Sequence, residues 1–119
     1  MHELLAHLDS AARVLDLGCG SGFSALPLAR MVGDEGRVIA VDLQPKMLSI
    51  LRRRAAKAGL AGRIQMHRCE PGSIAITTPV DFAVAFWMVH EVPDRRAFLA
   101  QVRCCLRPEA RFLVIEPTL

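Results

Sequence analysis

The sequence predicts an α/β fold in which helices cover a doubly wound parallel sheet. Short apolar segments of strand length alternate with segments of helix length along the 119 residues. The connections between them are short, and several contain Gly or Pro. This alternation is typical of a series of βαβ units, whose strands lie parallel. The expected strands cover residues 13–17, 37–43, 63–68, 80–88 and 111–116.

The helices are predicted from apolar residues at helical spacing. Pro27 lies near the end of the first turn of its helix, where amide groups have no intrahelical partner, so it is tolerated there. Gly59 is expected to cap the second helix, and residues 107–110 to form a turn after the third. The expected helices cover residues 22–32, 45–58 and 95–106, after an initial helix that ends near residue 8. The inward positions of the third are Phe98, Leu99, Val102 and Leu106.

Length and composition predict a single domain over residues 1–119, with enough apolar residues (52%) to bury a core. No apolar run has the length of a membrane span and the start is not basic, so a cytoplasmic protein without membrane contact is expected. The net charge of +3 is mild, and the basic cluster at residues 52–57 lacks stacking aromatic residues. We therefore expect a solvated helix face and no nucleic-acid partner. The four cysteines lack metal-ligand spacing, which predicts reduced thiols and no metal site.

A glycine-rich turn follows the first expected strand, in the segment VLDLGCGSG at residues 14–22. Gly18, Gly20 and Gly22 alternate, and Asp16 precedes them by two residues. Glycine lets a ligand approach the backbone closely, and free amides at a helix start favour polar or negative ligand groups. The spacing differs from the dinucleotide fingerprint G-x-G-x-x-G, whose third glycine would fall at Phe23. A nucleotide-like cofactor is the favoured ligand, and a purely structural turn is the alternative.

Asp42 ends the second expected strand, 20 residues after Gly22. An acid at this position can accept hydrogen bonds from both ribose hydroxyl groups of an adenosine ligand. The alternative is that Asp42 caps the helix that begins near Pro45. In the ribose interpretation, Leu43 is placed to pack against the adenine face.

Four segments together resemble the class I methyltransferases that depend on S-adenosylmethionine. They are VLDLGCGSG at 14–22, AVDLQPKML at 40–48, MVHEVPD at 88–94 and CLRPEARFLVIEP at 105–117. The similarity is greatest to the methyltransferase-domain group that includes the ubiquinone and menaquinone biosynthesis enzymes. It implies a Rossmann-like core with the strand order 3-2-1-4-5, and S-adenosylmethionine bound across the carboxyl ends of the strands, with S-adenosylhomocysteine as the product.

The resemblance also implies which residues contact the cofactor. Asp16 and the glycine turn would bind its methionine end, and Glu70, or the backbone of Cys69, would meet the adenine amino group. Glu70 as a simple loop carboxylate is the alternative, and for Trp87 and Met88 the alternative to lining the pocket is core packing. The expected cofactor-binding residues are Asp16, Gly18, Cys19, Gly20, Gly22, Asp42, Leu43, Glu70 and Trp87.

The sequence departs from the family at its end. The turn that usually reads L-x-P-G-G is Leu106-Arg107-Pro108-Glu109-Ala110 here, which suggests a different turn. The helix and the β6–β7 hairpin that follow the fifth strand in the family are absent from the 119 residues, so we expect an incomplete core. The apolar FLVI segment at 112–115 would then be an exposed sheet edge. This predicts a homodimer, or a partner that covers the edge.

His90, after the fourth strand, is the best placed base for an acceptor that must lose a proton on methylation. Alternatives for His90 are a helix-entry residue or a hydrogen-bonded structural histidine, and Glu91 is a weaker candidate base. No N-P-P-[YF] motif follows the fourth strand, which favours a small-molecule acceptor over nucleic acid. A competing function is a non-catalytic or truncated S-adenosylmethionine-binding module. A nicotinamide-binding domain is a further alternative, which the glycine spacing disfavours.

Overall fold

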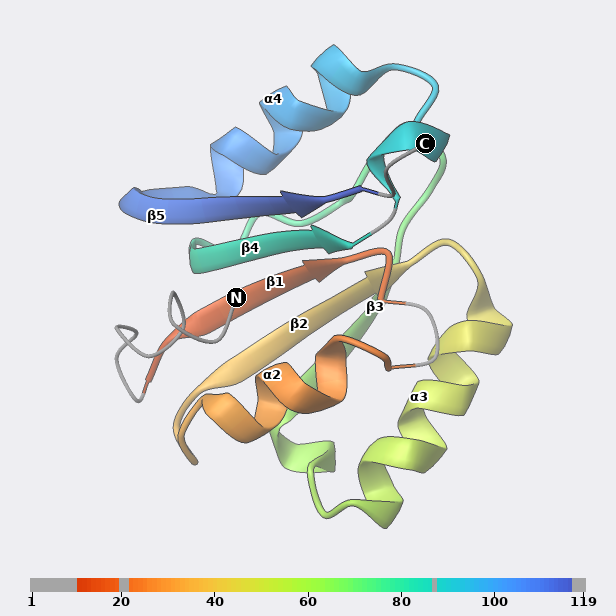
Figure 1. The fold of residues 1–119 in the computed structure, drawn as a ribbon, viewed down its shortest axis with the longest axis vertical. Helices are drawn as coiled ribbons and strands as arrows, with labels where there is room; N and C mark the ends of the chain where they lie inside the picture. Colours follow the sequence, from red (N-terminus) through yellow and green to blue (C-terminus); the bar gives the residue numbers. More distant parts are fainter. Residues whose placement is uncertain (1–10, 20–21, 87, 117–119) are drawn as a thin grey trace.

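A computed structural model describes residues 11–19, 22–86 and 88–116 of the chain. Its sheet has five strands in the order β3-β2-β1-β4-β5, and all neighbouring strands are parallel (Figure 1). The predicted fold class and strand order are confirmed. The strands are β1 (Arg13–Leu17), β2 (Arg37–Asp42), β3 (Ile64–Arg68), β4 (Val80–Phe86) and β5 (Leu106–Ile115).

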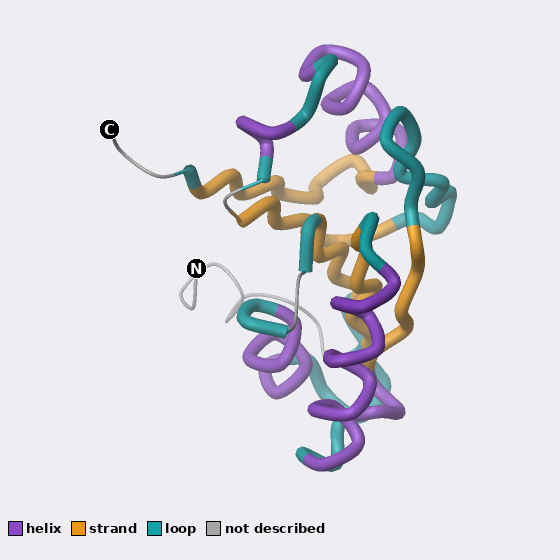
Figure 2. Tube along the Cα trace, turned by 90° about the vertical axis from the view of Figure 1, so that its right-hand side faces the viewer, coloured by secondary structure: helices purple, strands orange, loops and turns teal. Residues whose placement is uncertain are grey.

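Helices cover both faces of this sheet. Helices α2 (Ala25–Met31) and α3 (Pro45–Lys57) pack on one face and α4 (Arg95–Cys105) on the other, so the sheet is doubly wound (Figure 2). Two short 3₁₀ helices, η1 (Ala61–Arg63) and η2 (Val89–Glu91), precede β3 and follow β4. No helix in the described part of the chain is long and apolar enough to cross a membrane.

The central strands are buried on both faces, which explains their nearly continuous apolar sequence. Side chains alternate along a strand, so Val14 of β1 packs with the α2 and α3 layer while Leu15 packs with the α4 layer. In β4, Phe82 and Ala83 divide between the same two layers. All four of these side chains are essentially inaccessible to solvent.

The expected turn at residues 107–110 is wrong. Helix α4 ends at Cys105 and β5 begins at once with Leu106, so the segment is extended. Its pairing with β4 is irregular: Val80 pairs with Leu106, and the next pair is Phe82 with Arg111. The sequence lacks the two glycines of the usual turn, and an extended strand with a bulge needs no left-handed residue. The carboxylate of Asp81 lies beside this irregularity, 3.4 Å from the guanidinium of Arg107.

The inner face of α4 differs from the predicted one in two positions. Leu99 is 43% exposed and Leu106 belongs to β5, whereas Phe98, Val102 and Cys105 are buried. The buried residues follow i, i+4 and i+7, so Leu99 lies one step beyond the buried stripe. The other two helices were predicted within a few residues. Helix α2 starts at Ala25 rather than residue 22, and its Pro27 is the third helical residue.

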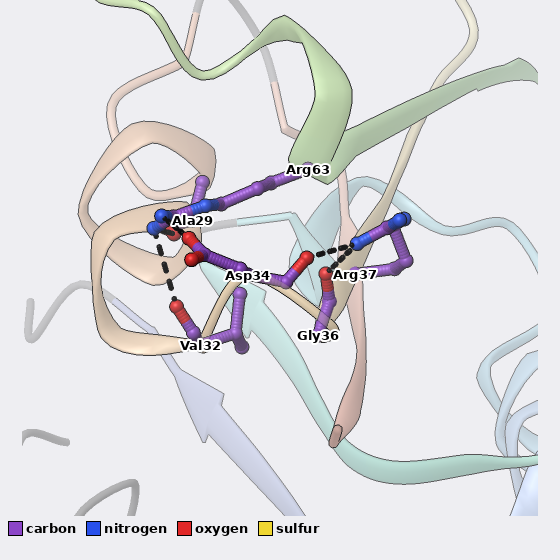
Figure 3. Close-up of polar contacts among 6 residues, drawn as sticks. All are labelled: Ala29, Val32, Asp34, Gly36, Arg37 and Arg63. Atoms are coloured by element: carbon purple, nitrogen blue, oxygen red, sulfur yellow. Dashed lines mark hydrogen bonds and ion pairs between the residues drawn. The ribbon is translucent and has the colours of Figure 1, made fainter. Parts of the chain in front are cut away.

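Arg63, the last residue of η1, contacts the end of α2 and the turn that follows it (Figure 3). Its guanidinium donates to the carbonyl oxygens of Ala29 at 3.2 Å and Val32 at 3.4 Å, and it pairs with the carboxylate of Asp34. Arg37 donates to the carbonyl of Asp34 at 2.8 Å. A cation at the last carbonyls of α2 complements the negative end of the helix dipole. These contacts connect η1, the end of α2 and the start of β2, at the end of the sheet opposite the carboxyl ends of the strands.

Candidate functional site

A cavity of about 480 Å³ lies at the carboxyl ends of the strands. The ends of β1 and β2 form one side of it, with Gly18 and Leu43. The loop after β3 (residues 69–74), the segment after β4 and the helix α4 form the rest. Since β1 lies between β2 and β4, and the helices that follow β1 and β4 leave for opposite faces, this is the switch point where ligands bind in open α/β sheets.

The glycine turn holds the chain against β2. The backbone amides of Gly18 and Cys19 both donate to the carbonyl oxygen of Val41, at 2.9 and 3.0 Å. Gly18 has a φ of +71°, and a Cβ placed on it would lie 2.8 Å from Cγ of Met88, another cavity residue. Only glycine fits this backbone and leaves the cavity open at this point.

The other predicted residues of the turn lie outside the cavity lining or outside the described chain. Cys19 is buried, and burial together with the neighbouring carboxylate of Asp16 raises the pKa of its thiol, which favours the protonated form. Gly22 has a φ of +108°, and a Cβ there would lie 2.8 Å from Cδ1 of the buried Leu51. Gly20 falls outside the described residues.

Asp16 is fully buried beneath the start of α2. The hydroxyl oxygen of Ser24 lies 2.9 and 2.8 Å from its two carboxylate oxygens. The pKa of Asp16 is raised to about 7. Desolvation is the largest cause, the Ser24 hydrogen bond opposes it, and the charge of Asp42 adds to it. Its carboxyl group is not part of the cavity lining formed by the described residues, so its contact with the methionine end of a cofactor remains a prediction.

Asp42 is the last residue of β2 and Leu43 follows it. Asp42 is buried and is not part of the cavity lining formed by the described residues. Oδ1 of Asp42 accepts a hydrogen bond from the backbone amide of Gln44 at 2.9 Å. Gln44, rather than Asp42, is the N-cap residue of α3 and makes no side-chain cap of its own. Asp42 therefore supports the helix start through the cap residue's backbone. Leu43 lines the cavity and is 47% exposed, so its apolar side chain is accessible to a ligand.

The loop after β3 brings Glu70 to the cavity wall. The amide of Cys69 donates to the carbonyl of Asp42 at 3.0 Å, which extends the pairing of β3 with β2 by one residue. Glu70 and Ser73 exchange backbone hydrogen bonds of 3.0 Å and close a tight turn. Cys69 and Glu70 both line the cavity, as their predicted contact with an adenine ring requires.

His90 lies in η2 beside the cavity rather than in its lining. Its Nδ1 is 2.5 Å from Oε2 of Glu116, and its backbone amide donates to Oε1 of the same residue at 3.2 Å. Its Nε2 is 3.7 Å from Oε1 of Glu91, which does line the cavity. Desolvation raises the pKa of Glu116, but the hydrogen bonds and charge of His90 outweigh it and lower the net pKa. Trp87 lies outside the described residues, and Met88 lines the cavity.

Comparison with known proteins agrees with this geometry. The family model described as "Methyltransferase domain" matches residues 14–109, which run from β1 into β5. The chain belongs to the methyltransferase domain family.

Three proteins illustrate what the chain is similar to. The ubiquinone/menaquinone biosynthesis C-methyltransferase of Teredinibacter turnerae is 30% identical over 105 residues, which are 87% of this chain and 42% of that protein. The catechol O-methyltransferase of Mycobacterium tuberculosis is 33% identical, over 94% of this chain and 50% of that protein. The solved structure of a SAM-dependent methyltransferase from Aquifex aeolicus superposes with a TM-score of 0.82 and 30% identity, covering 93% of this chain and 59% of that one. The chain spans half or less of the length of these two curated relatives.

Two residues of this methyltransferase domain that sequence reasoning missed are Gln101 and Glu116. Glu116 had a signal, because it follows the apolar run of β5 much as Asp42 ends that of β2. Gln101 had a weaker one, a polar side chain three residues after Phe98 on the inner side of α4. Its hydrogen bonds, to Ile74 and Gly72, join segments nearly 30 residues apart and have no sequence signature.

We predict that Asp16→Asn changes how stability depends on pH. The folded-state pKa of about 7 exceeds the ordinary 3.8, so the native state binds more protons than the unfolded state between these pH values. The contribution of Asp16 to stability is therefore present below pH 4 and lost as the pH rises to 7. Relative to wild type, the free energy of unfolding of Asp16→Asn should rise between pH 4 and pH 8 by up to about 4 kcal/mol.

Urea denaturation at several pH values measures this difference, with Glu35→Gln as a matched control at an exposed position. If the free energies of unfolding of wild type and Asp16→Asn change with pH in the same way, the buried carboxyl group titrates in its ordinary range.

Proposed function

We propose that this chain binds S-adenosylmethionine at the carboxyl edge of its sheet and transfers the methyl group to a small-molecule acceptor. The observation that carries the proposal is the cavity bounded by the Gly18 turn on one side and by Leu43, at the tip of β2, on another. The membership of the methyltransferase domain family supports it.

The residues around the cavity suit the chemical groups of this cofactor. Gly18 keeps one wall free of side chains, so the backbone is accessible to the ligand. The carboxylate of Asp42 offers about four acceptor sites. We propose that it accepts hydrogen bonds from the ribose hydroxyls at the end of β2, next to the cavity residue Leu43. Leu43 offers an exposed apolar surface to the adenine ring, and the Cys69–Glu70 segment offers carbonyl and carboxylate acceptors to its amino group.

The predicted methionine-end contacts remain part of this proposal. They involve Asp16, Cys19 and the turn from Gly18 to Gly22. S-adenosylmethionine supplies an electrophilic methyl group on a sulfonium ion, and the chain's part is orientation, exclusion of water and proton removal. We place the acceptor among small aromatic hydroxyl compounds, since one relative is named a catechol O-methyltransferase and others are named for quinone biosynthesis.

His90 is the proposed base for such a hydroxyl acceptor. The carboxylate of Glu116 only accepts hydrogen bonds, so it holds the hydrogen of the imidazole on Nδ1. Nε2 is then the nitrogen that can take a proton, and it points to the side of Glu91, on the cavity rim. Glu116 also binds the backbone amide of His90, so ring and backbone are held by one carboxylate. Glu91 is the alternative base.

We further propose that the β5 edge pairs with a second copy of the chain. In the sheet formed by the described residues β5 is an outer strand, and Phe112, Leu113 and Ile115 are only partly buried. Val114 is 41% exposed. A long apolar edge strand is a template for pairing with another chain. A homodimer in the cytoplasm would meet the expectation from the sequence.

The first prediction from the proposed function concerns the cofactor. Asp42→Ala should weaken binding of S-adenosylhomocysteine by roughly 1–3 kcal/mol, because a charged acceptor of the ribose hydroxyls is lost. Titration calorimetry with S-adenosylhomocysteine, and with NAD as a control ligand, measures this. Asp42→Asn is the matched variant, since its amide oxygen can still accept from Gln44. If Asp42 only supports the start of α3, stability should fall and the affinity of the folded protein stay unchanged. Binding of NAD alone would favour a nicotinamide domain.

The second prediction concerns proton transfer. His90→Gln should lower turnover of catechol and hydroquinone acceptors by roughly 10²–10⁴-fold and leave the affinity for S-adenosylhomocysteine unchanged. Glu116→Gln should give a smaller loss and alter the pH profile of turnover, because the ring loses its charged partner. Radiolabelled methyl transfer measures both. Equal turnover in wild type and His90→Gln would exclude the base, and cofactor binding without turnover of any acceptor would favour a binding module.

The third prediction concerns assembly. Val114→Lys should convert a dimer to a monomer, since a charge on the exposed edge opposes strand pairing. Light scattering after size exclusion measures the mass of each species. Leu99→Lys is the control, because Leu99 is equally exposed but lies on α4. A wild-type monomer would contradict the proposed dimer.

A further inference from the structure

The cavity wall formed by residues 69–74 has no helix or strand of its own beyond one isolated bridge between Glu70 and Ser73. Its start is tied to β2 through the amide of Cys69. Pro71 and Gly72, at its tip, are exposed. After Ile74, the backbone of Ala75 has a φ of +55°, which is uncommon for a residue with a side chain. The position of this wall therefore depends on contacts with the rest of the molecule.

Gln101 of α4 supplies two such contacts with one side chain. Its Oε1 accepts a hydrogen bond from the backbone amide of Ile74 at 2.9 Å. Its Nε2 donates to the backbone carbonyl of Gly72 at 2.9 Å. Both ends of the carboxamide are thus used, and both partners are backbone groups of the wall. A primary amide can satisfy a donor and an acceptor at once, which no carboxylate or aliphatic side chain of similar length can do.

The attachment continues along the same side of α4. Cys105, one helical turn after Gln101, directs its thiol to the carbonyl oxygen of Ile76 at 3.0 Å. Ile74 packs in the same buried cluster as Phe98 and Val102 of α4. Gln101 itself lines the cavity, together with the wall that it holds. Two polar side chains and apolar packing therefore join the wall to α4, and of these two side chains Gln101 is the one that lines the cavity.

We infer that Gln101 is a positioning residue for the cofactor: its two hydrogen bonds set the place of the Glu70–Ile74 wall, and so the affinity for the adenosine half of S-adenosylmethionine. This assignment rests on the proposed function of the cavity. The adenosine half is the relevant one, because Leu43 and Glu70, the residues proposed to contact adenine, border the same cavity as the wall.

The test compares Gln101→Leu and Gln101→Glu with wild type. Leu has a similar volume and no hydrogen-bonding group, and Glu keeps the acceptor for Ile74 but loses the donor for Gly72. Titration calorimetry with S-adenosylhomocysteine and with 5′-methylthioadenosine, which carries only the adenosine half, measures affinity. Gln101→Leu should weaken both ligands by the same factor of about 10, and Gln101→Glu by less. Arg103→Gln, at an exposed position of α4, is the matched control.

A separate measurement distinguishes positioning from general stability. Amide hydrogen exchange should show faster exchange at Ile74 in Gln101→Leu, while β1 and β2 keep their protection. Urea denaturation gives the folded fraction for each calorimetric experiment. Reduced stability with unchanged affinity of the folded protein for both ligands would overturn the role of Gln101. Failure of wild type to bind S-adenosylhomocysteine would instead overturn the proposed function, and this assignment with it.

Discussion

The left-handed backbone at Gly18 is the constraint on which the candidate site depends. At this residue the chain leaves β1 and turns, so that the amides of Gly18 and Cys19 both reach the carbonyl of Val41 in the neighbouring strand. A side chain at Gly18 would meet Met88, which follows β4. The turn thus joins the end of β1 to β2 through these two hydrogen bonds. It also leaves space between the end of β1 and the segment after β4. Both relations are needed for an open cavity at the carboxyl edge.

Burial of the Asp16 carboxyl group next to the glycine turn costs free energy, because the group loses its contact with water. Asp16 is fully buried, and desolvation is the largest cause of its raised pKa. Stability alone would favour an apolar side chain at such a position. Residues with strongly perturbed pKa values cluster at functional sites. The family membership and the cavity are consistent with this interpretation.

Helix α4 and the segment before it hold both the proposed base and the link to the cavity wall. The segment that leads into α4 contains His90 and Glu91, and α4 itself carries Gln101. Glu116, which follows β5, binds both the ring and the backbone amide of His90. The wall of the cavity and the proposed base are therefore both positioned by the part of the chain between β4 and the end of β5. The glycine turn and the tip of β2 are positioned by β1, β2 and the helices on the opposite face.

The sequence by itself determined the fold class, the strand order implied by the family resemblance, and the residues at the tips of β1 and β2. These follow from local signals: apolar periodicity, glycine spacing, and acids at strand ends. Only the tertiary structure decided three other features, because each depends on residues far apart in the chain. Residues 107–110 belong to β5 and lie between its pairs Val80–Leu106 and Phe82–Arg111 with β4, although locally they look like a turn. His90 is bound by Glu116, 26 residues away. Gln101 holds the wall at Gly72 and Ile74 because the packing of α4 on the sheet brings them together, a proximity that no local pattern encodes.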